Sequence, residues 1–81
     1  MKNFFDVRFI YLKNGMIEFL GACPNGFYYT KTKTFYTSDN KKKFKLKKVK
    51  KVKYRISDIN KWEVVNIKEF LEIVKKYKNY Y

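Results

Sequence analysis

The sequence has no histidine, one cysteine and one proline, and few acidic residues. Without histidine the chain cannot supply a histidine general base, and one cysteine cannot supply the roughly four ligands of a Cys/His zinc site. Cys23 has no partner within the chain, which excludes a disulfide framework. A chain of 81 residues that is 46% hydrophobic and 21% aromatic is predicted to form a single domain, residues 1–81, with a thin core.

The sequence also lacks the features of a secreted or membrane protein. Its amino terminus has no long apolar run of the signal-peptide type. The longest uninterrupted apolar stretch, residues 9–12, is far shorter than the ~20 residues that a membrane-spanning helix needs. Together with the unpaired Cys23, these absences predict a soluble, cytoplasmic protein with no membrane partner.

The seven acidic residues are spread along the chain and form no motif. A metal-dependent active site needs two or three converging carboxylates, and a serine or cysteine nucleophile needs a base that activates it. Ser38, Ser57 and Cys23 have no histidine to activate them. We therefore predict that the protein is not an enzyme and has no cofactor, no metal ion and no catalytic residues.

Positive charge is what the sequence has in excess. The chain holds 20 Lys and Arg against 7 Asp and Glu, for a net charge of +13, and only Arg8 and Arg55 are arginines. An abundance of Lys, Asn, Ile, Tyr and Phe is typical of AT-rich coding sequences, so codon bias explains part of the lysine content. Codon bias alone would not suppress glutamate, whose codons are also A-rich. Because a charge this high repels itself in the folded state, it favours a polyanionic partner.

Residues 4–20 have the pattern of a β-hairpin. Two runs rich in aromatic and β-branched residues flank Asn14-Gly15, a strong short-range signal for a two-residue turn. Such a turn would pair Ile10 with Phe19 on one face. Both faces of the hairpin are partly apolar, so we expect it to pack against other elements on more than one side.

Residues 27–56 have the pattern of a second, strongly basic hairpin with its turn at Asp39-Asn40. Threonine and aromatic residues favour a strand over 27–37. Residues 41–56 alternate apolar and basic side chains with a period of two, although apolar residues at spacings of three and four also fit a helix. The two strands would form a ribbon about 30–35 Å long at ~3.3 Å per residue.

Residues 67–79 have the pattern of an amphipathic helix. Asn66 fits the N-cap position, with Glu69 three residues later as in a capping box. Residues 61–65 fit a short last strand, and Trp62 within it is expected to anchor the core under the helix. The predicted fold class is α+β: an antiparallel sheet of four to five strands in two hairpins, followed by one C-terminal helix packed on one face.

The basic hairpin is the candidate functional site. Ten of the 15 residues 41–55 are basic, and like charges that face each other across strands destabilise a hairpin unless a partner compensates them. Lysine contacts phosphates without reading sequence, and tyrosine rings stack on unpaired bases. The candidate nucleic-acid-binding residues are Lys31, Lys33, Lys43, Lys45, Lys47, Lys48, Lys50, Lys51, Lys53, Arg55, Tyr28 and Tyr36.

The sequence therefore predicts a small basic module that binds nucleic acid or a nucleoprotein through largely sequence-independent phosphate contacts. The plain alternative for the lysine run is a solvated charged face. A Lys- and Tyr-rich domain of AT-rich composition is also typical of phages and plasmids, which favours a second hypothesis. In it, the chain is an inhibitor of the anti-CRISPR type that occupies the nucleic-acid channel of a host nucleic-acid-handling protein, or an acidic surface on it, with exposed tyrosines as anchors.

Two further interactions are compatible with the sequence. The basic C-terminal helix also fits a membrane surface, but its capping pattern favours packing on the sheet. An unpaired hairpin edge would allow a homodimer.

Overall fold

The computed structural model describes residues 4–22, 24–56 and 59–78. Within these ranges the chain forms seven strands, one turn of 3-10 helix and one α-helix. The predicted fold class, an α+β antiparallel sheet with a C-terminal helix packed on one face, is confirmed. The elements are β1 (Phe4–Leu12), β2 (Ile17–Phe19), β3 (Gly26–Tyr29), β4 (Thr34–Tyr36), β5 (Lys43–Lys45), η1 (Leu46–Lys48), β6 (Val49–Ile56), β7 (Ile59–Asn66) and α1 (Ile67–Lys78).

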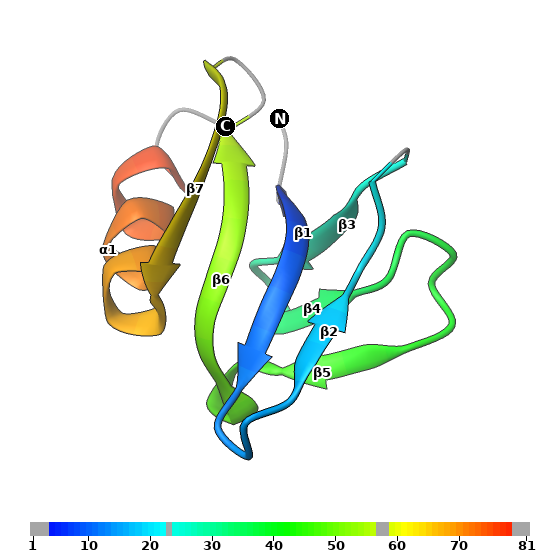
Figure 1. Cartoon of the computed structure of the whole chain (residues 1–81). Helices are drawn as coiled ribbons and strands as arrows, with labels where there is room; N and C mark the ends of the chain where they lie inside the picture. The colour runs from blue at the N-terminus through cyan, green and yellow to red at the C-terminus, as the bar shows by residue number, and fades with distance from the viewer. Residues whose placement is uncertain (1–3, 23, 57–58, 79–81) are drawn as a thin grey trace.

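The sheet is organised around β1. The strand order is β5-β4-β3-β1-β6-β7, and β2 also pairs with β1. Residues 4–7 of β1 pair with β3, residues 9–11 pair with β2, and β6 pairs along the other edge. Figure 1 shows the consequence: β7, β6, β1 and β2 lie side by side in front, while β3, β4 and β5 turn away behind them.

The core fills the space between the two parts of the sheet and helix α1. Phe70 of α1 is fully buried, and its ring centroid lies 5.2–6.1 Å from those of Phe5, Tyr28, Phe35 and Tyr54. These four rings come from β1, β3, β4 and β6, so a single helical side chain contacts both parts of the sheet. The helix therefore closes one face of the front strands and leaves their opposite face open.

Helix α1 begins where the capping pattern predicts. The Asn66 Oδ1 accepts a hydrogen bond from the Glu69 backbone N–H at 2.8 Å, and Asn66 Nδ2 donates to Glu69 Oε1 at 3.2 Å. Because these bonds satisfy an otherwise unpaired backbone donor, they hold the first turn. The predicted strand over 61–65 lies within β7, and residue 79 lies outside the described residues.

The first hairpin forms, but with a register shifted by one residue. The Leu12 N–H donates to Met16 O at 2.8 Å and the Gly15 N–H donates to Leu12 O at 3.0 Å, with Gly15 at φ +92°. This is a three-residue loop with a left-handed last residue, a geometry that matches strand twist as well as the two-residue turn does. Phe19 therefore pairs with Phe9 instead of Ile10.

The shift has a large effect on the surface. A slip of one residue moves every side chain of a strand to the other face of the sheet. Ile17 and Phe19 consequently point to solvent, with 59% and 54% of their surface exposed. The expectation that Phe19 pairs with Ile10 is wrong for this reason.

The second hairpin forms as predicted only next to its turn. Thr34 pairs with Lys45 and Tyr36 with Lys43, as a turn at Asp39-Asn40 predicts. The chain turns again before β4 and after β5, so the predicted 30–35 Å ribbon of two strands does not form. Residues 49–56 instead pair with β1, which buries Val49 and Val52 completely. A two-stranded ribbon would leave such apolar side chains without a core, and burial of this surface favours the sheet.

Candidate functional site

One face of the front strands gathers aromatic rings and cations. Side chains alternate along a strand, and Ile10, Val52 and Tyr54 point into the core. Their neighbours therefore point the opposite way, to a surface that we call the outer face. Its residues are Arg8, Phe9, Tyr11, Ile17, Phe19, Lys51, Lys53, Arg55, Trp62 and Val64.

A row of paired residues crosses four strands of the outer face. Phe19 of β2 pairs with Phe9 of β1, Phe9 pairs with Lys53 of β6, and Lys53 pairs with Val64 of β7. The Phe9 and Phe19 ring centroids are 5.1 Å apart at an interplanar angle of 53°. Lys53 Nζ lies 5.9 Å from the Phe9 centroid. The row thus sets two rings directly beside an ammonium group.

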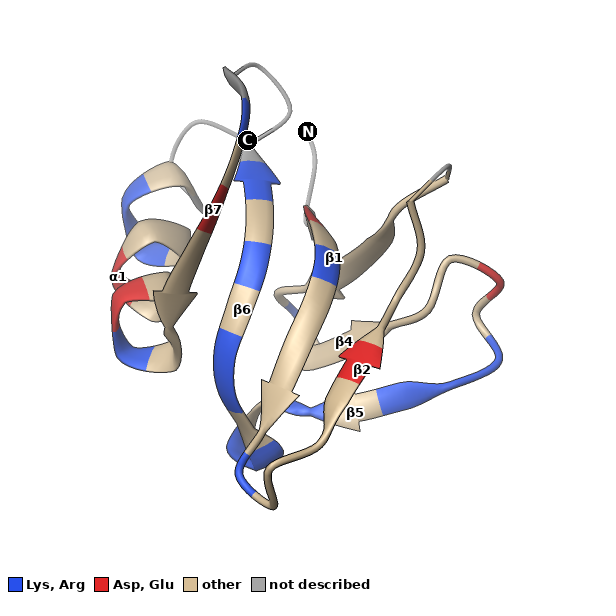
Figure 2. Ribbon diagram, in the orientation of Figure 1, with Lys and Arg blue, Asp and Glu red and all other residues tan. Residues whose placement is uncertain are grey.

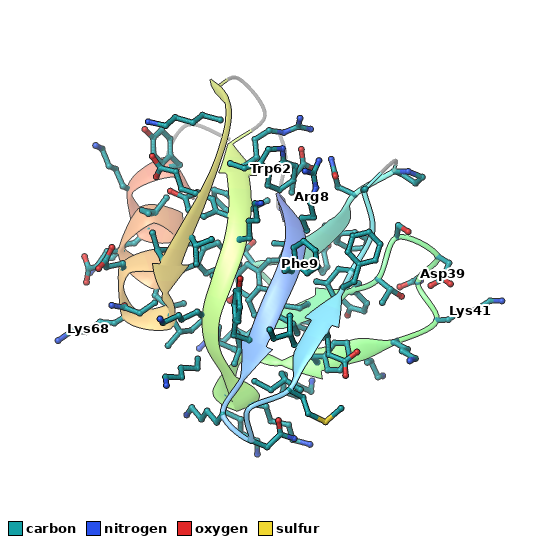
Figure 3. All side chains as sticks on the ribbon, in the orientation of Figure 1. Arg8, Phe9, Asp39, Lys41, Trp62 and Lys68 are labelled. Atoms are coloured by element: carbon teal, nitrogen blue, oxygen red, sulfur yellow. The ribbon has the colours of Figure 1, made fainter. Side chains whose placement is uncertain are left out.

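A second cluster lies beside this row, around Trp62. The Arg8 guanidinium carbon is 4.2 Å from the centroid of the Trp62 ring, and that of Arg55 is 5.0 Å away. Arg55 also forms an ion pair of 3.0 Å with Asp6. Figure 3 shows Arg8, Phe9 and Trp62 together in front of the central strands. The expectation that Trp62 anchors the core is wrong. Side chains alternate along β7, and Glu63 and Val65 face the core side, so Trp62 lies on the opposite face.

Large apolar side chains are exposed mainly on this face. In the described part of the chain, five large hydrophobic residues are exposed, and four of them lie on the outer face or at its edge. They are Met16 (55%), Ile17 (59%), Phe19 (54%) and Val64 (50%). Contiguous exposed apolar surface marks interaction sites in soluble proteins.

The charge of the outer face is positive. Across the described ranges, no carboxylate forms an ion pair with Arg8, Lys51 or Lys53. Figure 2 shows basic positions recurring along β6 and concentrated at the end of the sheet near η1. An anionic partner would therefore meet uncompensated cations next to exposed rings.

The structure divides the predicted site residues among three places. Lys51, Lys53 and Arg55 lie on the outer face. Tyr36, Lys43 and Lys45 lie on β4 and β5, where the Tyr36 ring stacks on Phe27 at 5.1 Å and 21°. The others lie near η1 or in the turn between β3 and β4: Lys31, Lys33, Lys47, Lys48 and Lys50.

Tyr28 does not belong to any of these surfaces. Only 2% of its surface is exposed, and its ring contacts Phe35 and Phe70 in the core. Burial also raises the pKa of its phenol. Its predicted role in base stacking is wrong, because a base cannot reach the ring.

Sequence reasoning missed Arg8, Phe9, Phe19 and Trp62 as site residues. The signal that could have found the phenylalanines is the turn type. A three-residue loop at residues 13–15 is also compatible with the sequence, and it would have assigned Phe9 and Phe19 to the same face.

Other functional features are not found in the described part of the chain. No group of three or more His, Cys, Asp or Glu residues there could hold a metal ion. No described helix is long and apolar enough to cross a membrane. The chain matches no protein-family model, and no curated protein or solved structure matches it.

Proposed function

We propose that the outer face binds single-stranded nucleic acid, free or within a nucleoprotein complex. The observation that carries this proposal is the row of Phe19, Phe9 and Lys53 on an exposed sheet. Proteins that bind single strands combine aromatic rings, on which bases stack, with cations that follow the phosphates. An exposed sheet carrying aromatic residues is one established platform for such stacking.

Several features favour a single strand over a duplex. The rings lie on a sheet surface, where only unpaired bases can stack on them. The chain contains only two arginines, the commonest readers of guanine in the major groove. Both arginines contact Trp62, so their guanidinium groups are already oriented by the protein. We therefore expect binding that depends little on base sequence.

Salt dependence is the first test. A fluorescent oligothymidylate of about ten nucleotides, a size that one small sheet domain can cover, is titrated with protein at several salt concentrations. About five phosphate contacts predict that log affinity falls with log salt at a slope near −3.5, since each contact contributes about 0.7 for single strands. A duplex of the same length should bind more weakly. Failure to bind at about 50 mM salt, where phosphate contacts are strong, would contradict the proposal.

Matched charge reversals locate the site. Lys51→Glu with Lys53→Glu removes the cations beside the rings. Lys75→Glu with Lys76→Glu changes the net charge by the same amount on helix α1, which covers the opposite side of the sheet. The proposal predicts a large loss of affinity for the first pair only. Equal losses would mean that the total charge, rather than the outer face, drives binding.

A protein partner is the second candidate function, as expected of an inhibitor. The observation that favours it is the exposure of Met16 and Ile17 at β2, a three-residue strand that pairs with β1 alone among the described strands. Exposed apolar side chains at the edge of a sheet are a typical contact surface for another protein. If oligonucleotides do not bind, Ile17→Glu should abolish capture of a specific host protein, whereas Lys75→Glu should not.

A further inference from the structure

A cavity of about 480 Å³ opens at the end of the molecule where η1 meets the beginning of α1. Its size is within the range of about 300–1,000 Å³ that is usual for small-molecule sites. The lining residues are Lys13, Thr32, Lys33, Lys45, Leu46, Lys47, Val49, Ile67 and Leu71. Four lysines and four apolar side chains therefore line the cavity, and none of the described residues that line it is acidic.

The lysines come from separate parts of the chain that backbone hydrogen bonds hold together. The Leu46 N–H donates to Lys33 O at 3.1 Å, which ties the β3–β4 turn to η1. The Lys13 N–H donates to Lys48 O at 3.0 Å, which ties the β1–β2 turn to the other end of η1. These bonds hold together the backbone segments that carry the lysines, and all four lysine side chains are exposed to solvent, where a ligand can reach them.

The charges of the four cavity lysines are not compensated by the acidic side chains that the structure describes. In the described ranges, no carboxylate forms an ion pair with the four cavity lysines. Lys45 Nζ donates a hydrogen bond to the neutral Thr34 hydroxyl at 3.4 Å. Lys33 has a left-handed backbone with φ +52°, which is unfavourable for a lysine. Residues in sparsely populated backbone regions cluster at binding sites, where the surrounding structure holds them in place.

We propose that this cavity binds a nucleotide unit, with the base against Leu46, Ile67 and Leu71 and the phosphate among the lysines. Leu71 is 38% exposed although it is a large apolar residue, so a planar base would cover surface that water now contacts. A doubly charged phosphate matches several converging ammonium groups. A fatty acid has one carboxylate, which would leave most of the lysines uncompensated.

The cavity is next to the outer face but does not depend on it. Lys13 also lines two adjoining hollows, of about 310 and 220 Å³. The smaller one is lined by Tyr11, Ile17 and Lys51 of the outer face. The nucleotide can therefore be a free one or the end of a strand bound to the outer face. Binding of a free nucleotide requires no contribution from that face.

Nuclear magnetic resonance titration tests the proposal. The ¹⁵N-labelled protein is titrated with AMP, adenosine and inorganic phosphate at low salt. AMP should produce saturable shifts at the amides of Lys33, Leu46 and Ile67. Adenosine should bind more weakly, since it lacks the charge. If inorganic phosphate binds as tightly as AMP at the same amides, the site takes an anion alone and the proposal is overturned. Shifts spread evenly over all lysines would also overturn it.

Matched variants identify the cations involved. Lys33→Gln with Lys47→Gln should weaken AMP binding about tenfold, because it removes two solvent-exposed charge contacts, each worth up to about fivefold in affinity. Lys75→Gln with Lys76→Gln removes the same charge on α1, outside the cavity, and should leave AMP affinity unchanged. Equal losses from both pairs would contradict the assignment. Lys51→Glu with Lys53→Glu should not affect AMP, so failure of the outer-face proposal would not imply failure of this one.

The source of the nucleotide is determined with oligothymidylates that differ only at the 5′ end. If the cavity receives the end of a strand, a 5′-phosphate should tighten binding, and Lys33→Gln with Lys47→Gln should remove the gain. If AMP binds and the 5′-phosphate has no effect, the cavity takes a free nucleotide. If neither AMP nor the phosphorylated end binds there, the proposal is wrong.

Discussion

Replacement of Phe19 by leucine separates base stacking from general hydrophobicity. The Phe19 side chain lies on the outer face with 54% of its surface exposed, and its main ring contact is with Phe9. A fully buried phenylalanine buries about 150–250 Å², so Phe19 buries about half of that, worth about 2–3 kcal/mol at ~25 cal/mol per Å². Leucine keeps most of this apolar contact. The free energy of unfolding should therefore fall by only about 1 kcal/mol or less.

The effect on binding should be larger. Stacking of one base on an aromatic ring contributes about 1–3 kcal/mol, which corresponds to a loss of about 5-fold to 150-fold in affinity for a single-stranded oligonucleotide. Fluorescence anisotropy with oligothymidylate measures the affinity, and thermal unfolding followed by circular dichroism measures stability. Phe19→Tyr, which keeps an aromatic ring, should retain affinity.

Ile17→Ala is the matched control. Ile17 lies on the same strand and face and is 59% exposed, but it has no ring. Its replacement should change affinity by about twofold or less, since no stacked base is lost. If Phe19→Leu binds as tightly as the natural chain, or if Ile17→Ala loses as much affinity as Phe19→Leu, stacking on this face is refuted.

Three further predictions follow from the core, the cavity and the titration of a buried tyrosine. Phe70→Ala removes contacts with four core rings and should lower the free energy of unfolding by about 3–5 kcal/mol, as measured by urea denaturation. A decrease below about 1 kcal/mol would contradict the role of Phe70 in the core. Lys33→Gly should stabilise the domain by up to about 1–2 kcal/mol, because glycine accepts a positive φ, and should weaken AMP binding; reduced stability would contradict the strained turn. Burial and the Glu63 carboxylate raise the pKa of Tyr54 to about 12. The raised pKa favours folding fully below the unfolded value of about 10, and this contribution is lost as pH rises toward 12. Chemical denaturation at a series of alkaline pH values should therefore show a loss of stability that is smaller in Tyr54→Phe, where the raised pKa of Tyr28 still contributes, and an equal loss in Tyr54→Phe would contradict this.

Local signals in the sequence predicted the fold class well. The N-cap at Asn66 and the apolar stripe of α1 are encoded within a few residues, so they could be read directly. The turn at Asp39-Asn40 is also local. Asp39 accepts hydrogen bonds from the Thr37 hydroxyl at 2.6 Å and the Lys41 N–H at 3.0 Å, which fixes the register of β4 and β5.

The features that escaped prediction depend on contacts between distant residues. Residues 49–56 alternate in a way that suits any sheet, and nothing local indicates that they pair with β1 rather than with the strand predicted over 27–37. The decisive factor is the burial of Val49 and Val52, which requires the whole core. The number of strands and the separation of the predicted lysines into three groups follow from this pairing.

The candidate site was predicted in its chemistry and only partly in its location. Lysines next to aromatic rings were expected, and Lys51 and Lys53 do pair with the half-buried aromatic residues Tyr11 and Phe9. The rings, however, are Phe9 and Phe19 rather than Tyr28, because a one-residue difference in the first turn decides which face they occupy.

Trp62 gives the most direct test of the outer face as the binding surface, since it is the only tryptophan in the chain and lies on this face in contact with Arg8 and Arg55. Its intrinsic fluorescence is followed while unlabelled oligothymidylate is added at low salt. We predict a saturable change whose midpoint moves to higher oligonucleotide concentration as salt rises. Binding detected by anisotropy without any change in Trp62 fluorescence would contradict the outer face as the site, and absence of binding by both methods would contradict nucleic-acid binding itself.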